Sequence, residues 1–223
     1  MPASIRPYRP DDRAAIRRIC CETGYRGFPI DPYCRDREFF ADLVTNIQLD
    51  VFPNWAWVAE VDNQLVGYVL GCPSSYAYHE TLVAHIWHLL GQSFRHSWWF
   101  RPGTAGFFWR GVLDLVGQPR PPNPDFQQWP AFAHINLLPA ARGRKLGQAL
   151  MTTCIGQIHA HGLPGMYVST VLEEHNGNNP LAFFTSLGFK PTLTYLKPGL
   201  RGVHGERLHT VIMCRTFNDL ALG

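Results

Sequence analysis

The sequence has 223 residues, of which 46% are hydrophobic and 17% are charged. A chain of this length and composition can bury a core, which excludes general disorder, and its length suits one large domain or two small ones. The formal net charge of +3 is too small to predict nucleic-acid binding by itself, although it allows a local site for an anion.

The six cysteines follow no metal-binding pattern, because the sequence has no CxxC pair and no Cys/His cluster with zinc spacing. Cys20, Cys154 and Cys214 lie within apolar periodic segments, where cysteine packs as a small hydrophobic residue. We therefore expect reduced thiols, no metal and a cytoplasmic protein. The opening MPASIRPYRPDDRAAI does not resemble a signal peptide, and no uncharged apolar run of about 18 residues predicts a spanning helix.

The first third of the chain predicts a strand, two helices and a hairpin. SIRPY (4–8) alternates as a strand does, and the next segment has helical spacing behind Asp11, a residue suited to cap a helix. Residues 37–48 carry a second apolar stripe with helical spacing. The β-rich runs 55–61 and 65–72, joined by the turn residues DNQ, predict a β-hairpin.

Residues 73–130 interrupt this regular order. Two segments with helical patterns, 81–94 and 105–117, precede a proline-rich connector, 118–130, that is unsuited to a helix or a central strand. We expect an aromatic-rich helical insertion that packs on the main domain. Its aromatic side chains either wall an acceptor pocket or form the ordinary contacts of the added helices. They are Tyr76, Tyr78, Trp87, Trp98, Trp99, Phe100, Phe107, Phe108 and Trp109.

The remainder of the chain predicts a strand–helix–strand unit followed by a short helix and two closing strands. The ranges are strand 131–138, helix 142–162, strand 165–172, helix 178–189, and strands 190–196 and 207–217. This order predicts an α/β (α+β) fold in a single domain over residues 1–223. We expect a mixed central sheet of about seven strands, flanking helices, and the helical insertion between the third and fourth strands.

The junction LPAARGRKLGQALM (138–151) carries the clearest sign of a binding site. A helix that begins just after a strand offers unpaired backbone N–H groups and the positive end of its dipole, which together favour an anion. Arg142, Arg144 and Lys145 add positive charge there. The motifs GxGxxG and GxxxxGK[ST] are absent, which disfavours a hydride-transfer enzyme and a nucleoside triphosphatase. A surface corner with solvated basic residues is the alternative interpretation.

Two segments resemble the GNAT acyltransferase superfamily. In LLPAARGRKLGQALM, the family signature R/Q-x-x-G-x-G/A is matched by Arg142 and Gly147, with Lys145 in place of the middle glycine. NNPLAFFTSLGF resembles the family segment N-x-x-A-x-x-F-Y-x-x-L-G-F, with matches at Phe183, Leu187, Gly188 and Phe189. More narrowly, HINLLPAARGRKLG and the long insertion resemble the acetyltransferase-like domains related to those of O-GlcNAc hydrolases.

The resemblance implies that acetyl-CoA binds in a V between the strand that ends at Leu138 and the strand 165–172. Backbone groups of Ile135 and Leu137 would pair with the pantetheine arm, and Asn176 or Asn179 would contact the cofactor together with Phe183 and Phe184. The pyrophosphate would lie on Arg142, Gly143, Arg144, Lys145, Leu146, Gly147 and Gln148. Lys145 either leaves its amide free and meets the 3′-phosphate, or blocks the usual loop conformation.

The resemblance also implies an N-acetyltransferase that acts on a primary amine of a small molecule or a lysine side chain. The acetyl group would move by direct attack in a ternary complex. The family often has a tyrosine acid where this chain has Phe184, so Tyr195 or Tyr167 would have to replace it. His134 is the candidate base, or else a structural histidine, and Asn136 would bind water or the amine. Further candidates for the base are Glu173, Glu174, His79 and Glu80.

Two other functions stay open at this point. Phe184, Asn136 and Lys145 favour a non-catalytic acyl-CoA-binding module, and the aromatic insertion favours a protein-interaction domain. We expect neither a nucleic-acid partner nor membrane contact, although SFRHSWWFR (93–101) is basic and aromatic. A homodimer stays open as well.

Overall fold

The structure is a computed structural model that describes residues 3–32, 34–95, 123–171, 179–201 and 207–217. The predicted helix 105–117 lies outside these ranges, as do the candidate residues Asn176, Glu173 and Glu174. The same holds for Trp98, Trp99, Phe100, Phe107, Phe108 and Trp109. Within the described ranges, none of the helices has the length and hydropathy that crossing a lipid bilayer requires.

The described strands form one seven-stranded sheet in the order β1-β2-β3-β4-β5-β7-β6. All neighbouring strands are antiparallel except β4 and β5, which are parallel. This arrangement confirms the predicted mixed sheet. The strands are β1 (Ala3–Pro7), β2 (Ala56–Val61), β3 (Gln64–Cys72), β4 (Ala131–Leu137), β5 (Gly165–Val171), β6 (Lys190–Arg201) and β7 (Arg207–Thr216).

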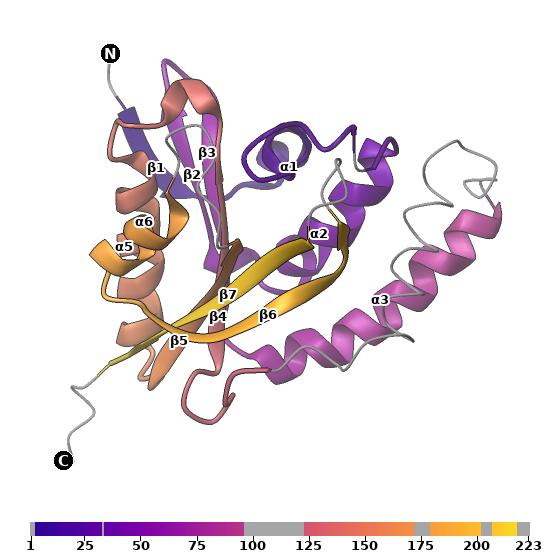
Figure 1. Cartoon of the computed structure of the whole chain (residues 1–223). Coiled ribbons are helices and arrows are strands. Elements are labelled where there is room, and N and C mark those ends of the chain that lie inside the picture. The colour runs from indigo at the N-terminus through magenta and orange to yellow at the C-terminus, as the bar shows by residue number, and fades with distance from the viewer. Residues whose placement is uncertain (1–2, 33, 96–122, 172–178, 202–206, 218–223) are drawn as a thin grey trace.

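Helices cover both faces of the sheet. Helices α5 (Leu146–Ala160) and α6 (Pro180–Ser186) lie on one face, and α1 (Arg13–Thr23) and α2 (Arg37–Val51) lie on the other (Figure 1). Because successive side chains of a strand point to opposite faces of the sheet, β3 contributes to the core on both faces. Its Val69 packs in the α5 core, while Tyr68 and Leu70 pack against α1 and α2.

The insertion contributes one described helix, α3 (Ser75–Arg95), which begins earlier than the predicted range 81–94. Its start is fixed by Ser75, whose N–H and hydroxyl both donate to the carbonyl oxygen of Pro130 at 2.7 Å. The helix extends away from the sheet beside α2 (Figure 1), and His85 Nε2 lies 3.0 Å from the carbonyl oxygen of Asp42. The single-domain assignment and the limits of the insertion stay predictions.

Other predicted element boundaries were also wrong, and α6 covers only Pro180–Ser186 of the helix predicted over 178–189. The helix predicted over 142–162 begins at Leu146, because Gly143 and Lys145 have positive φ angles of 75° and 59° that a right-handed helix does not allow. Asp11 does not cap α1, because it lies within a short 3-10 turn, Pro10–Asp12. Strand β6 continues to Arg201 rather than ending at residue 196.

A buried ion pair ties the start of α1 to the sheet. The Arg6 guanidinium on β1 donates two hydrogen bonds to the Asp12 carboxylate, at 2.7 and 2.8 Å, and also bonds Glu60 of β2. Asp12 is only 6% exposed, and it also accepts from the Arg9 amide at 2.8 Å. These hydrogen bonds, led by those from Arg6, lower the pKa of the Asp12 carboxyl.

We predict that Asp12→Asn destabilises the protein by about 2 kcal/mol at pH 7, because hydrogen bonds to a buried charge are lost. The control is Asp31→Asn, whose exposed pair with Arg37 should contribute less than about 1 kcal/mol. The pKa of Asp12 is lower in the folded state than in the unfolded state. Its contribution to the free energy of unfolding is therefore complete above the ordinary carboxyl pKa, and it is lost as the pH falls through the lowered pKa. Urea unfolding should therefore show a gap between wild type and Asp12→Asn that narrows below about pH 4. A gap that stays constant with pH would contradict this account.

Candidate active site

The sheet opens between its two parallel strands. β4 and β5 pair only at Ala131↔Met166 and Phe132↔Tyr167. Beyond these positions, β4 continues along β3 and β5 continues along β7, each in unbroken register. The two strands therefore form the arms of a V that widens toward the C-terminal end of β4.

Part of the β4 backbone faces this opening. The N–H of Leu138 donates to the carbonyl oxygen of Val66 on the β3 side, at 2.8 Å. Because backbone groups alternate in direction along an antiparallel ladder, those of Ile135 and Leu137 point away from β3, toward β5. The Leu137 carbonyl oxygen accepts from Arg142 Nη2 at 3.3 Å. Within the described residues, the Leu137 N–H and both backbone groups of Ile135 have no partner on β5.

The turn after β4 presents unused amides. The N–H groups of Ala141 and Arg142 bond Leu138 and Pro139, and the first helical bond of α5 runs from the Ala149 N–H to the Lys145 carbonyl oxygen at 3.0 Å. Between them, the amides of residues 143–148 bond no group in the described part of the chain. Such a series of N–H groups at a helix N-terminus suits an anion.

Lys145 adopts the backbone conformation that a glycine would normally supply. Its φ of 59° and ψ of 7° are left-handed, and it forms the N-cap position of α5. Its side chain is exposed, as is that of Arg144. With Lys145 in this left-handed conformation, the amides of residues 143–148 bond no group in the described part of the chain.

We predicted that Arg142 adds positive charge to the anion site, but its guanidinium bonds backbone carbonyl oxygens instead. Its Nη2 donates to the Gly27 carbonyl oxygen at 2.8 Å, in addition to the bond with Leu137. Burial of the guanidinium lowers its pKa. The side chain thus holds the turn against the loop between α1 and α2, and the positive charge exposed at the turn comes from Arg144 and Lys145.

Helix α6 packs against the first turn of α5. A Cβ at Gly147 would lie 3.4 Å from Phe183 Cζ and 3.5 Å from Leu137 Cδ1, so strand, turn and α6 meet at this glycine with room for ordinary contact. Phe184 is 6% exposed and lies in the core, with its ring centroid 5.0 Å from that of Phe183. Leu146 is also buried, and the side chain of Asn179 caps α6 by accepting from the Ala182 amide at 2.9 Å.

The candidate residues His134 and Asn136 lie together on the β4 arm. Asn136 Nδ2 is 3.5 Å from His134 Nε2 and donates to the Tyr68 hydroxyl at 2.9 Å. The ring of Tyr68 also contacts the His134 ring edge-on, with centroids 5.7 Å apart. Burial raises the pKa of Tyr68 well above its ordinary value. Sequence reasoning missed Tyr68, and its only local signal was a polar group within the apolar run LVGYVLGC.

Phenols lie on the other arm. Phe132 and Tyr167 are register partners, so Tyr167 is on the same sheet face as His134 and Asn136. The Tyr167 hydroxyl lies 3.4 Å from Ser75 Oγ, and burial raises its pKa to about 12. Tyr195 on β6 is on the same face, and burial raises its pKa as well. His79 is half-buried on α3, where its ring stacks on Phe126, and burial lowers its pKa.

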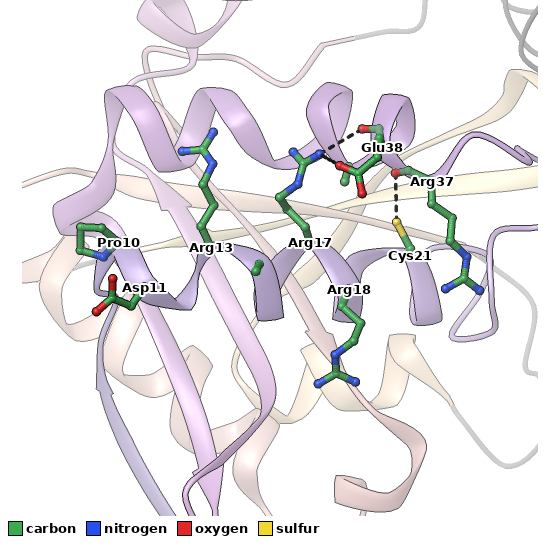
Figure 2. A pocket seen from close by; sticks show the side chains of 10 residues that line it. Pro10, Asp11, Arg13, Arg17, Arg18, Cys21, Arg37 and Glu38 are labelled. Carbon is green, nitrogen blue, oxygen red and sulfur yellow. Dashed lines mark hydrogen bonds and ion pairs between the residues drawn. The ribbon is translucent and has the colours of Figure 1, made fainter. Parts of the chain in front are cut away.

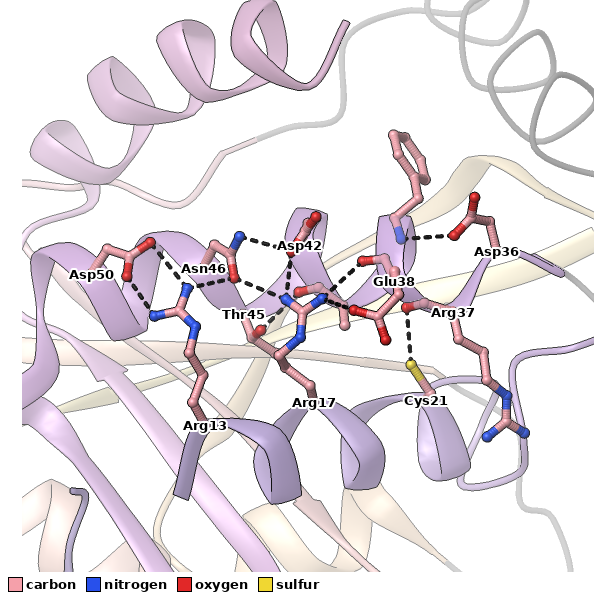
Figure 3. Close-up of polar contacts among 12 residues, drawn as sticks. Arg13, Arg17, Cys21, Asp36, Arg37, Glu38, Asp42, Thr45, Asn46 and Asp50 are labelled. Atoms are coloured by element: carbon pink, nitrogen blue, oxygen red, sulfur yellow. Dashed lines mark hydrogen bonds and ion pairs between the residues drawn. The ribbon is translucent and has the colours of Figure 1, made fainter. Parts of the chain in front are cut away.

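A separate hollow of about 580 Å³ lies between α1 and α2 and is lined by residues of those helices and of the turn before α1 (Figure 2). Four arginines line it, and each is paired with a carboxylate. Figure 3 shows the pairs of Arg13 and Arg17. Arg13 bonds Asp50 at 2.6 Å, and Arg17 bonds Asp42 at 2.5 Å and also Glu38. The hollow is therefore a compensated ion-pair network between two helices, and it is lined by no residue of β4 or β5.

No family model matches the sequence, but solved structures share its fold. The structure of SsHAT is 25% identical, with a TM-score of 0.63, and the match covers 97% of this chain and 98% of that one. A GNAT superfamily phosphinothricin acetyltransferase from Sinorhizobium meliloti, solved with acetyl-CoA, is 19% identical, with a TM-score of 0.60 and coverage of 100% and 93%. Ribosomal-protein-alanine N-acetyltransferase from Brucella melitensis is 18% identical, with a TM-score of 0.55 and coverage of 96% and 99%.

We predict that Lys145→Gly stabilises the protein by roughly 0.5–1 kcal/mol. A left-handed conformation costs a residue with a Cβ roughly 1–2 kcal/mol, and the greater freedom of glycine in the unfolded chain offsets part of that gain. Lys145→Ala is the matched control, because it removes the same charge and keeps the Cβ. Chemical denaturation should rank Lys145→Gly above both wild type and Lys145→Ala. Equal stability of the two variants would contradict the assigned backbone strain.

Proposed function

Because the chain has the fold of the GNAT acetyltransferases, we propose that it binds acetyl-CoA and transfers the acetyl group to a primary amine. The acceptor class is a small molecule or a lysine side chain. One observation carries the proposal. The opening between β4 and β5 leads directly into a turn whose amides, from residue 143 to residue 148, are free to bind an anion.

The chain has groups that fit each part of the cofactor. The backbone of Ile135 and the N–H of Leu137 suit the amide-containing pantetheine arm, which would pair with β4 as an added strand does. The amides of Gly143, Arg144, Lys145, Leu146, Gly147 and Gln148 suit the pyrophosphate. The exposed charges of Arg144 and Lys145 suit the 3′-phosphate. Phe183, beside Gly147, supplies an apolar wall to this site.

The reaction needs no covalent enzyme intermediate. The neutral amine nitrogen attacks the thioester carbonyl carbon, a C–N bond forms and the C–S bond breaks. The amine nitrogen loses one proton, and the departing thiolate of coenzyme A gains one. The protein has to hold the two reactants together, accept the first proton and supply the second.

His134 is the proposed base, with Asn136 beside it to bind the acceptor amine or a water molecule. Tyr195, on β6 beyond the β5 arm, is the proposed acid to the thiolate, since Phe184 has no hydroxyl and is packed in the core. In this proposal the proton acceptor and the proton donor come from opposite sides of the opening, and both are on the same face of the sheet. A non-catalytic acyl-CoA-binding module is the second candidate, favoured by the buried phenylalanine at the usual position of the acid.

Cofactor binding is the first prediction from this proposal. Acetyl-CoA at about 100 times its dissociation constant should add roughly 2.7 kcal/mol of stability. For a chain of this size, the melting temperature should rise by roughly 5–10 °C. The double variant Arg144→Glu/Lys145→Glu should lose most of this rise, because both reversals repel phosphate. The control is Arg9→Glu, a charge reversal at an exposed residue that follows β1. Strands β2 and β3 lie between β1 and β4, so Arg9 is far from the turn. No rise in wild type at millimolar acetyl-CoA would reject the proposed cofactor site.

Acetyl transfer is the second prediction. A panel of amines and lysine peptides, with release of coenzyme A as the measurement, should identify at least one acceptor. His134→Ala should lower kcat by about 100-fold or more, since a positioned base contributes 10²–10⁴-fold. His161→Ala serves as control, because His161 ends α5 and bonds its own helix at the Gln157 carbonyl oxygen. Binding of acetyl-CoA without transfer to any amine would favour the non-catalytic module instead.

A further inference from the structure

A row of polar groups crosses the core between α1 and the opening of the sheet. It runs from Cys20 on α1 to Tyr68 on β3, and then to Asn136 and His134 on β4. Cys20 and Tyr68 are both completely buried and lie in the same core cluster. Burial raises the pKa of the Cys20 thiol to about 12, so the thiol stays protonated.

The hydroxyl of Tyr68 lies in surroundings where a phenylalanine would be expected. Along its own strand the next residue on the same face is Leu70, and its register partner on β2 is Val58, both fully buried and apolar. A buried hydroxyl carries a desolvation cost unless it is hydrogen-bonded. Its partner on the other side is Asn136, the register partner of Tyr68 on β4.

We propose that Tyr68 is a positioning residue of the active site, which fixes the side-chain amide of Asn136 beside His134 on the β4 arm of the opening. This inference rests on the proposed acetyltransferase function. A free asparagine side chain rotates between several staggered conformations. The bond at 2.9 Å to a hydroxyl that cannot move out of the core restricts Asn136 to one of them.

The Tyr68 ring also restricts the orientation of the His134 imidazole. It meets the His134 ring edge-on, at an interplanar angle of 72°. Tyr68 thereby contacts both candidate residues of β4, one through its hydroxyl and the other through its ring. Tyr68→Phe separates these contacts, because it removes the hydroxyl and keeps the ring.

The test is a double-mutant cycle of Tyr68→Phe and Asn136→Ala, with stability and steady-state kinetics measured for each variant. Misplacement of a reacting group by about 1 Å costs roughly 100-fold, so Tyr68→Phe should lower kcat by about 10- to 100-fold. The KM for acetyl-CoA should stay within about twofold of wild type, since Tyr68 lies outside the cofactor turn. In the Asn136→Ala background, Tyr68→Phe should have no further effect on kcat, because the group it positions is absent.

Tyr78→Phe is the matched control. Tyr78 is a tyrosine of α3 whose ring packs on Phe132, also on β4, at a centroid distance of 4.8 Å. Burial raises its pKa to about 12, as expected for a phenol removed from solvent. A purely structural role for Tyr68 predicts that both variants lose stability and keep kcat. Additive losses of kcat in the double-mutant cycle would overturn the inference. Equal losses of kcat in Tyr68→Phe and Tyr78→Phe would overturn it as well.

A second measurement does not depend on turnover. The side-chain amide protons of Asn136, assigned by their absence in Asn136→Ala, should exchange with solvent roughly tenfold faster in Tyr68→Phe than in wild type, as loss of a hydrogen bond of about 1.4 kcal/mol implies. Tyr78→Phe should leave their exchange unchanged. Unaltered exchange in Tyr68→Phe would reject the positioning role even if acetyl transfer is intact. Absence of acetyl transfer in wild type would reject the proposed function and leave this measurement to decide whether Tyr68 fixes Asn136.

Discussion

The arrangement of the candidate site depends on the loss of backbone pairing between β4 and β5. After two shared register positions, β4 follows β3 and β5 follows β7. An unpaired strand edge inside a sheet is costly unless another group meets its N–H and C=O groups. The edge at Ile135 and Leu137 is therefore both a consequence of the fold and a place where an amide-containing ligand can pair.

The turn that follows β4 supplies the anion site. Lys145 accepts a left-handed conformation, which allows α5 to begin with its first amides unbonded. Strain of about 1–3 kcal/mol at such a residue is typical of functional sites, where the surrounding structure holds it in place. Here Arg142 fixes part of the turn, because its guanidinium bonds the carbonyl oxygen of Leu137 at the end of β4 and that of Gly27 in the loop between α1 and α2.

The two arms of the opening differ in chemistry. The β4 arm carries an imidazole and an amide supported from the core by Tyr68, whereas the β5 side carries phenols supported by serine hydroxyls. Asn136 and Tyr167 are thus each held by a second group from a neighbouring element. Phe184 has no hydroxyl and is packed in the core, and Tyr195 and Tyr167 lie on the same face of the sheet as His134.

The sequence by itself determined the type and order of nearly every described element, because helical and strand periodicity and turn residues act over a few neighbouring positions. It also marked the junction at residues 138–151, where strand, glycines and basic residues are consecutive. It could not show that Lys145 would adopt a positive φ angle, which moved the start of α5 from residue 142 to Leu146. The tertiary structure alone decided the partners of Arg142 and Asn136, since Gly27 and Tyr68 are 115 and 68 positions away in the chain. Those contacts depend on strand register and helix packing, which are set by the whole core and leave no periodic signal near either residue.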